Sequence, residues 1–295
     1  MPIRAISFDL FDTLVDLEME KLPEFELAGQ RRRGTLPALY AALPENLRGS
    51  IDFETFGHAL DTVDARLRAT REAAGRELPT RERFAALLAH LRAGPRQALD
   101  ARSAQHPAVA PNQPGPPTPP SGPTSPLALS DDHAEALALE LTAVHMGEIQ
   151  SRARALDDTP GVLRTLHERF PLAVCSNFSH SPTALRVLSE AGLDFAFHAT
   201  VISEDVGYRK PHPEIFTQTA RALGLPPSDI LHVGDNLTAD IQGATTAGMQ
   251  TAWITRRIPN RDTALTRHLA SGGLRPDHTI THLHELLETF PASRP

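Results

Sequence analysis

The chain has 295 residues, a formal net charge of −7 and a hydrophobic fraction of 40%. This length allows one large domain or two ordinary ones with an ample core, and the acidic balance lacks the basic footprint of a nucleic-acid-binding protein. No stretch approaches 18 apolar residues, and acids occupy the N-terminal segment where a signal peptide needs an apolar run. The only cysteine, Cys175, cannot form an internal disulfide. We therefore expect a cytoplasmic protein with no membrane or nucleic-acid partner.

The N-terminal run at residues 3–8 predicts a buried strand, and it leads directly into Asp9-Leu10-Phe11-Asp12-Thr13-Leu14. In an open parallel sheet, ligands bind beyond the carboxyl ends of the strands. A carboxylate at this point is therefore a candidate for chemistry, although an isolated aspartate at a strand end more often caps a turn.

Residues 17–155 have a different pattern. Apolar residues recur at helical spacing over 53–67 and 84–91, and no strand is indicated, so we predict an all-helical insert. Within it, residues 103–126 hold nine prolines among glycine, serine and threonine. Such a composition cannot pack a core, which predicts a disordered linker. The basic run at 31–33 is interpreted as a solvated helix end.

From residue 157 onward, short apolar runs alternate with helical patterns, which favours a parallel α/β sheet. The runs lie at 172–175, 199–202, 230–233 and 251–254. The first strand must join this later sheet. We therefore predict a core domain of residues 1–16 and 156–295, with the insert of residues 17–155 set in after the first strand.

The ends of these runs carry polar residues in a consistent order. The run at 172–175 is followed by Ser176 and Asn177, and the run at 199–202 leads to Lys210 just before a helix. The run at 230–233 is followed by Asp235, five residues before Asp240. Lysine occurs only at positions 21 and 210, against 27 arginines. A compact ammonium that fits beside a carboxylate is a physical reason for lysine at position 210.

This set resembles the four signature motifs of the haloacid dehalogenase superfamily, over the whole predicted sheet domain. The likeness is to subfamily I, with a helical C1-type cap, and it implies a Rossmann-like core and a mobile cap inserted after the first motif. By this resemblance Asp9 matches the nucleophile and Lys210 the lysine that steadies nucleophile and phosphate. The remaining matches are Ser176 and Asn177 for substrate, and Asp235, the Phe11 backbone carbonyl and, behind them, Asp240 for the metal.

The implied reaction is hydrolysis of a small phosphorylated metabolite through an aspartyl-phosphate on Asp9. A carboxylate that attacks a phosphate dianion is repelled by several kcal/mol at low effective dielectric. Mg²⁺ between Asp9, Asp235 and the phosphate would remove that repulsion, and oxygen ligands suit this ion. We therefore expect a magnesium-dependent phosphatase with Mg²⁺ as its cofactor.

One position departs from the family pattern. Phosphatases of the family usually carry a second aspartate two residues after the nucleophile as general acid and base, and here that residue is Phe11. Asp12 is adjacent, but extended geometry sends residues three apart to opposite faces. A catalytic role for Asp12 and a role as a loop cap both stay open.

Three alternatives follow from this departure. Haloacid dehalogenases of the superfamily also have an aromatic residue at this position and use their aspartate without a metal. Relatives that cleave phosphonates need a cap lysine, for which Lys21 is the candidate. The third alternative is a catalytically weak binding or regulatory module. The acid pair Asp235 and Asp240 favours the phosphatase, because buried acids beside Asp9 would repel one another without a cation.

Overall fold

The computed structural model of the chain describes residues 3–103 and 129–290. These residues fall into two compact units. The core unit holds the residues up to Met19, Arg71–Pro79 and the residues from Ile149 onward, and the cap unit holds Glu20–Thr70 and Thr80–Glu148.

This division differs from the predicted domain bounds in two places. Strand β2 (Val15–Leu17) pairs antiparallel with β5 (Ala153–Ala155), so the segments that leave and re-enter the core belong to the core unit. Residues Arg71–Pro79, which lie inside the insert in sequence, also belong to the core unit. The predicted linker at 103–126 lies, from residue 104 on, outside the described residues.

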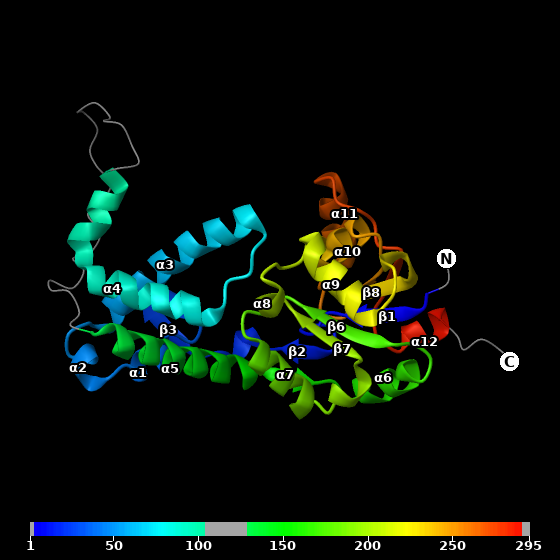
Figure 1. Cartoon of the computed structure of the whole chain (residues 1–295), viewed down its shortest axis with the longest axis horizontal. Coiled ribbons are helices and arrows are strands. Elements are labelled where there is room, and N and C mark those ends of the chain that lie inside the picture. The colour runs from blue at the N-terminus through cyan, green and yellow to red at the C-terminus, as the bar shows by residue number, and fades with distance from the viewer. Residues whose placement is uncertain (1–2, 104–128, 291–295) are drawn as a thin grey trace. The chain divides into compact units, whose positions relative to one another are not determined.

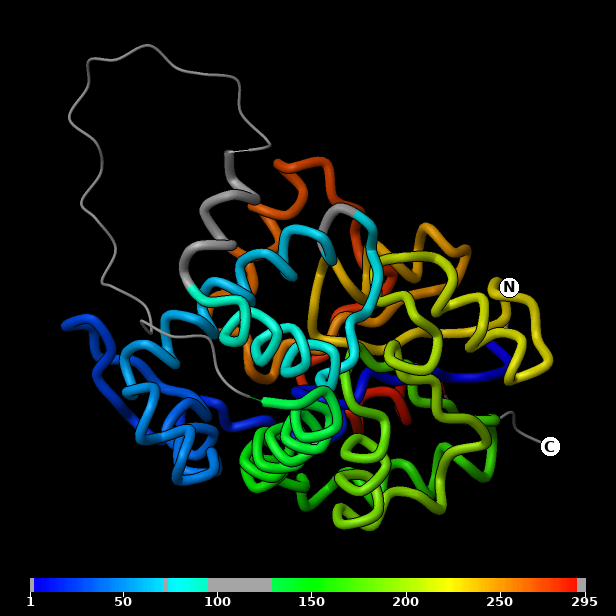
Figure 2. Tube along the Cα trace, turned by 60° about the vertical axis from the view of Figure 1, so that its left-hand side comes forward, coloured from blue at the N-terminus to red at the C-terminus, as the bar shows by residue number. Residues whose placement is uncertain are grey.

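A six-stranded parallel sheet forms the centre of the core unit, in the order β10-β9-β8-β1-β6-β7. Its strands are β1 (Ala5–Phe8), β6 (Leu172–Ser176), β7 (Ala199–Ile202), β8 (Ile230–Gly234), β9 (Gln250–Ile254) and β10 (His278–Ile280). Figure 2 shows the blue N-terminal segment running beside strands from the second half of the chain. The predicted α/β Rossmann-like class is confirmed.

Helices connect these strands (Figure 1). They are α6 (Thr159–His167), α7 (Ser181–Glu190), α8 (Ser203–Val206), α9 (Pro213–Leu223), α10 (Gly243–Thr246), α11 (Arg261–Ala270) and α12 (Glu285–Thr289), with a π-helical segment, η4 (Leu237–Gln242), before α10. Short 3-10 turns lie at η1 (Met19–Lys21), η2 (Asp194–Ala196) and η3 (Pro227–Asp229).

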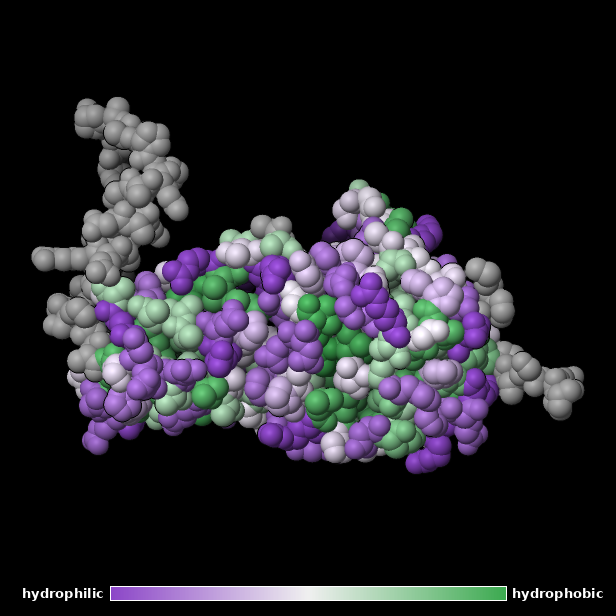
Figure 3. All heavy atoms as spheres, in the orientation of Figure 1, coloured by the Kyte–Doolittle hydropathy of each residue, from purple (hydrophilic) through white to green (hydrophobic). Residues whose placement is uncertain are grey.

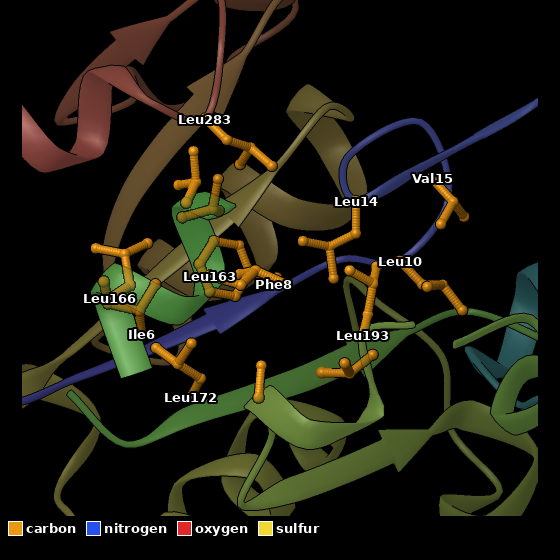
Figure 4. Packing of buried hydrophobic residues seen from close by; sticks show 14 of the residues in the cluster. Ile6, Phe8, Leu10, Leu14, Val15, Leu163, Leu166, Leu172, Leu193 and Leu283 are labelled. Atoms are coloured by element: carbon orange, nitrogen blue, oxygen red, sulfur yellow. The ribbon is translucent and has the colours of Figure 1, made fainter. Parts of the chain in front are cut away.

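The two faces of the sheet have separate hydrophobic cores, because successive side chains of a strand point to opposite faces. Ile6 and Phe8 of β1 pack with Leu163 and Leu166 of α6 on one face (Figure 4). Ala5 belongs to the other cluster, which includes Ile215 and Phe216 of α9. Burial of β1 on both faces explains why the strand is an almost continuous apolar run.

The cap unit is helical, as predicted. Its helices are α1 (Leu36–Ala41), α2 (Glu45–Arg48), α3 (Phe53–Ala74), α4 (Thr80–Ser103) and α5 (Asp131–Gln150), of which α3 and α5 extend by a few residues into the core unit. Their apolar faces share one core, in which Phe56, Phe84, Leu87 and Leu141 are fully buried. Helical spacing of these residues places them on the inner face of each helix.

One expectation about the insert is wrong, because it contains strands. β3 (Glu24–Leu27) and β4 (Gln30–Arg33) form a hairpin, so the basic run at 31–33 lies in a strand and not at a helix end. Ala28 and Gly29 both have positive φ, 51° and 71°, as a two-residue type I′ turn requires. Opposite charges face each other across the hairpin, with Glu24 opposite Arg33 and Glu26 opposite Arg31. The charged sequence hides the strands because most of their side chains are exposed.

Hydrophilic and hydrophobic residues alternate over the face drawn in Figure 3. None of the helices in the described part of the chain combines the length and apolar composition that a membrane span requires.

Candidate active site

The order of the sheet gathers the predicted site residues at one edge. β1 lies between β6 and β8, with Phe8 in register with Val174 on one side and Val233 on the other. Asp9 follows β1, and its backbone N–H donates to the Val233 carbonyl at 2.8 Å. The carboxyl ends of these three parallel strands therefore lie together, which brings residues 9, 176–177 and 235 to one place.

Lys210 is the cation of this edge, and it is buried with 3% of its surface exposed. Its Nζ lies 2.7 Å from Asp9 Oδ1, 2.6 Å from Asp240 Oδ1 and 2.8 Å from the Cys175 carbonyl oxygen. An ammonium has three N–H donors, so these acceptors use all of them. Although burial opposes its charge, the two carboxylates raise the pKa of Lys210 above its ordinary value. The lysine is therefore a fixed positive charge beside Asp9.

Asn177 positions that lysine. Its side-chain Nδ2 donates to the Lys210 carbonyl oxygen at 2.9 Å, and its Oδ1 accepts from the Lys210 backbone N–H at 2.6 Å. Both ends of the amide are thus occupied by the Lys210 backbone. The predicted contact of Asn177 with substrate would have to come from the second Nδ2–H or from its own backbone.

Asp240 is fully engaged by the protein. Besides Lys210, its carboxylate accepts from the backbone N–H of Asn236 at 2.9 Å and lies 3.2 Å from His232 Nε2. Burial raises the pKa of Asp240, but Lys210 and His232 outweigh burial and hold it below its usual range. A carboxylate that is bonded on all sides would suit a place behind metal ligands, which is the role that the resemblance implies.

Asp235 is the contrasting acid. Within the described part of the chain, no donor or cation contacts its carboxylate. Burial and the charges of Asp9 and Asp240 raise its pKa to about 8. Its backbone is held, because Trp253 Nε1 donates to the Asp235 carbonyl oxygen at 2.8 Å. The site therefore holds the backbone of Asp235 in place and brings no described cation into contact with its carboxylate.

The donor set fits a divalent cation. One oxygen from each of Asp9, Asp235 and Asp240 lies within 4.8 Å of the others. Burial, together with Asp240, also raises the pKa of Asp9 above its ordinary value despite the opposing effect of Lys210. No backbone N–H of the described residues donates to the Phe11 carbonyl, which leaves that oxygen available. Oxygen donors with an excess of negative charge are what Mg²⁺ prefers.

Ser176 provides an unused hydrogen bond at the same edge. Its Oγ is buried, and it has no partner among the described residues. Buried polar groups without a partner are rare in native proteins. The hydroxyl is therefore free to donate to a substrate oxygen, and its role in substrate binding stays a prediction. Thr13 Oγ1, in the loop after Asp9, is buried without a partner in the same way.

Asp12 points to other partners. Its backbone is left-handed, with φ of 59°. Its Oδ1 accepts from the backbone N–H of Leu17 at 3.1 Å and lies 3.2 Å from Arg257 Nη1. The carboxylate therefore closes the loop and forms an ion pair, although its charge is close enough to contribute to the raised pKa of Asp235.

Two residues of the site escaped the sequence analysis. His232 lies in β8 behind Asp240, and its Nδ1 is 2.8 Å from the Oγ of Ser7 in β1. Ser7 and His232 are direct partners in the register of the two strands, and both are fully buried. A signal was present, because each is a polar residue within an otherwise apolar run.

Glu77 also escaped prediction, and it joins two loops of the core unit. It is buried, with Oε2 accepting from Ser203 Oγ at 2.6 Å and Oε1 lying 3.6 Å from Arg209 Nη1. Ser203 Oγ in turn accepts from the backbone N–H of Phe178 at 2.9 Å. The loop that holds Lys210 and the loop after Ser176 are thus tied to one carboxylate.

Known proteins support this assignment of the fold. A family model described as haloacid dehalogenase-like hydrolase matches residues 3–248. The solved 2-haloacid dehalogenase from Pseudomonas syringae pv. Tomato DC3000 covers 97% of both chains, with a TM-score of 0.59 and 22% identity. At this identity the likeness shows the fold alone.

Two relatives are phosphatases by name. The glyceraldehyde 3-phosphate phosphatase of Methanopyrus kandleri is 48% identical over 69 residues, which are 23% of this chain and 30% of the relative. The 5-amino-6-(5-phospho-D-ribitylamino)uracil phosphatase YigB of Escherichia coli is 31% identical over 126 residues, which are 43% of this chain and 50% of the relative. The chain thus spans half or less of the length of these relatives. Because the family model covers most of the chain, the protein belongs to the haloacid dehalogenase-like hydrolases.

Proposed function

We propose that the protein is a magnesium-dependent phosphatase of small phosphorylated metabolites, with Asp9 as its nucleophile, acting in the cytoplasm. The observation that carries this proposal is an imbalance of charge. Three aspartates converge at the strand ends, and one ammonium, that of Lys210, lies among them. Asp235 has no cation of its own among the described residues, so a divalent ion between Asp235 and Asp9 would complete the site.

The residues of the chain have separable roles in this reaction. Asp9 attacks the phosphorus atom in line with the leaving oxygen and forms an aspartyl-phosphate, which water then hydrolyses. Lys210 orients the attacking carboxylate, because its Nζ holds Asp9 Oδ1 at 2.7 Å. The unpaired Ser176 hydroxyl donates to a phosphate oxygen, where charge gathers in the transition state.

The metal has an assigned place in this scheme. Asp9, Asp235 and the Phe11 carbonyl would hold it, while Asp240 stays with Lys210 and His232. Mg²⁺ bound there would supply the positive charge that lets a carboxylate approach a phosphate dianion.

A metal-independent 2-haloacid dehalogenase is the second candidate, and Phe11 favours it. An aromatic residue at this position fits displacement of halide from carbon, which needs no proton donor. Asp235 argues against it, because a reaction without a metal leaves this buried carboxyl group with neither a function nor a counter-charge.

The test compares phosphate release from p-nitrophenyl phosphate with halide release from a 2-haloacid, each with Mg²⁺ or with EDTA. We expect phosphate release that EDTA abolishes. Asp9→Asn and Asp235→Asn should both remove it, whereas Asp262→Asn, at a side chain that is 97% exposed, should not. Metal-independent halide release would establish the dehalogenase instead, and an active Asp9→Asn enzyme would exclude Asp9 as the nucleophile.

A further inference from the structure

Phe11, the second residue after Asp9, has no side-chain group that can donate a proton. Phe11 is half-buried, and its ring packs against the ring of Phe178 with 4.8 Å between centroids. An inference about substrate class follows from this position, and it rests on the proposed phosphatase function. It concerns the group that leaves when Asp9 attacks phosphorus.

Apart from Asp235, which the proposed metal would engage, the titratable groups around Asp9 are committed to other bonds. All three Lys210 N–H donors are used by Asp9, Asp240 and the Cys175 carbonyl. Asp12 accepts the Leu17 N–H and pairs with Arg257. Its carboxylate is therefore held in the loop by the Leu17 N–H and by Arg257.

The two histidines of the neighbouring loops are anchored in those loops. His212 accepts from the backbone N–H of Glu214 through Nδ1 at 3.2 Å, and its ring stacks on Tyr208 with 4.1 Å between centroids. His180 lies before α7, with its Nδ1 2.9 Å from Thr183 Oγ1. Each ring therefore has a structural role at the start of a helix.

The chemistry of the first step then depends on the leaving group. An Asp9 oxygen forms a bond to phosphorus, the bond from phosphorus to the leaving oxygen breaks, and the leaving oxygen keeps the electron pair. With no proton supplied, it departs as an anion, so the barrier rises with its basicity. A carboxylate, whose acid has a pKa of about 4, or a phenolate, at about 10, leaves more readily than an alkoxide, whose alcohol is about as weakly acidic as water, at roughly 15.7.

We propose that this enzyme selects phosphate compounds whose leaving group is a weakly basic anion, acyl phosphates above all, and discriminates against alkyl phosphates. With an acyl phosphate, the carboxylate leaves with the bonding pair and needs no proton. Water then attacks the phosphorus of the aspartyl-phosphate, the Asp9 carboxylate is released, and the proton from water passes to the phosphate product or the solvent. The aspartyl-phosphate is itself an acyl phosphate, so its own leaving group needs no acid either.

The test measures kcat/KM, which reports the first step, for acetyl phosphate, a series of substituted phenyl phosphates and glycerol phosphate, with Mg²⁺ present. For the wild-type enzyme, kcat/KM should fall steeply as the pKa of the leaving group rises. General acid catalysis typically contributes about 10²–10⁴-fold, so Phe11→Asp should raise the ratio of glycerol phosphate to acetyl phosphate turnover by a factor in this range. Phe11→Asn matches the aspartate in size without its proton, and it should keep the wild-type ratio.

The outcomes separate the inference from the function on which it rests. A shallow dependence on leaving-group pKa, with alkyl and acyl phosphates turned over alike, would overturn the inference while the phosphatase stands. If His180→Asn or His212→Asn made such a shallow dependence steep, that histidine would be the missing acid. Absence of phosphate release from every compound, acetyl phosphate included, would overturn the phosphatase itself. If Phe11→Asp fails to fold, the wild-type series alone decides.

Discussion

Replacing Lys210 by methionine tests the electrostatic centre of the site. The substitution keeps the length of the side chain and removes an ammonium that lies 2.7 Å from Asp9 and 2.6 Å from Asp240. Breaking a buried ion pair by removing one partner costs about 3–5 kcal/mol. The pKa of Asp9, already raised by burial, should rise further once this ammonium is removed, which favours the protonated form of its carboxyl group.

The loss of stability should depend on pH in a defined direction. A carboxylate whose pKa is higher in the folded than in the unfolded state loses stability as the pH rises from the unfolded value toward the folded one. The ordinary value for Asp9 and Asp240 is 3.8. The deficit in the free energy of unfolding of Lys210→Met, relative to wild type, should thus be smaller near pH 4 than at neutral pH and should grow between the two. The contribution of Lys210 itself, whose pKa lies above 10.5 in the folded state, stays constant across this range.

Urea unfolding at several pH values measures this difference. The chain supplies its own control, because the other lysine, Lys21, is exposed. Lys21→Met should change the free energy of unfolding by no more than about 0.5 kcal/mol at any pH. A Lys210→Met deficit that is the same at pH 4 and pH 7 would refute the reasoning, since a simple packing defect does not titrate.

Other parts of the site give further predictions. Because the pKa of Asp235 is raised to about 8, the metal-free protein should lose stability from about pH 4 to pH 8. In calorimetry, Mg²⁺ should raise Tm more at pH 8 than at pH 6. Asp235→Asn should show neither the pH-dependent loss nor the Mg²⁺-dependent rise in Tm. Asp12→Asn keeps an acceptor for the Leu17 N–H and loses the ion pair with Arg257, so the free energy of unfolding should fall by about 1 kcal/mol at most. The pH profile of kcat/KM should stay unchanged, and loss of a limb of that profile would identify Asp12 as catalytic. Glu77→Gln leaves Arg209 without its buried counter-charge, and it should cost about 1–3 kcal/mol in urea unfolding; an unchanged midpoint would contradict this.

The sheet was predictable because its strands are buried on both faces. The apolar runs at 172–175, 199–202, 230–233 and 251–254 lie in β6, β7, β8 and β9. A strand buried on both faces contains few polar residues, so a short run of four or five residues is sufficient evidence. β10 lies at the edge of the sheet and includes two polar residues, His278 and Thr279, so it lacks the mostly apolar run of the other strands.

The hairpin in the cap unit and the segment at 71–79 were not predictable for the opposite reason. β3 and β4 have mostly exposed side chains, so their charges conceal the alternation that marks a half-buried strand. Glu77 is buried, yet its partner Ser203 lies 126 positions away. Local patterns contain no information about such a pair, because a buried carboxylate is recognised only by the donors that surround it.

The identity of the aspartates in the site could be read from the sequence, but their ion-pair partners could not. Five aspartates lie in the segments 9–16 and 235–240, and their identity and order were readable from the sequence. Their different roles depend on cations that are distant in the chain, since Lys210 serves Asp9 and Asp240. The other two with a basic partner are Asp12, with Arg257, and Asp16, with Arg256. Asp235 alone has no basic side chain against its carboxylate in the described part of the chain. A buried acid without a counter-charge is unstable in its ionised form, so Asp235 either takes up a proton, as its raised pKa indicates, or is held in its charged form by a cation such as the proposed Mg²⁺.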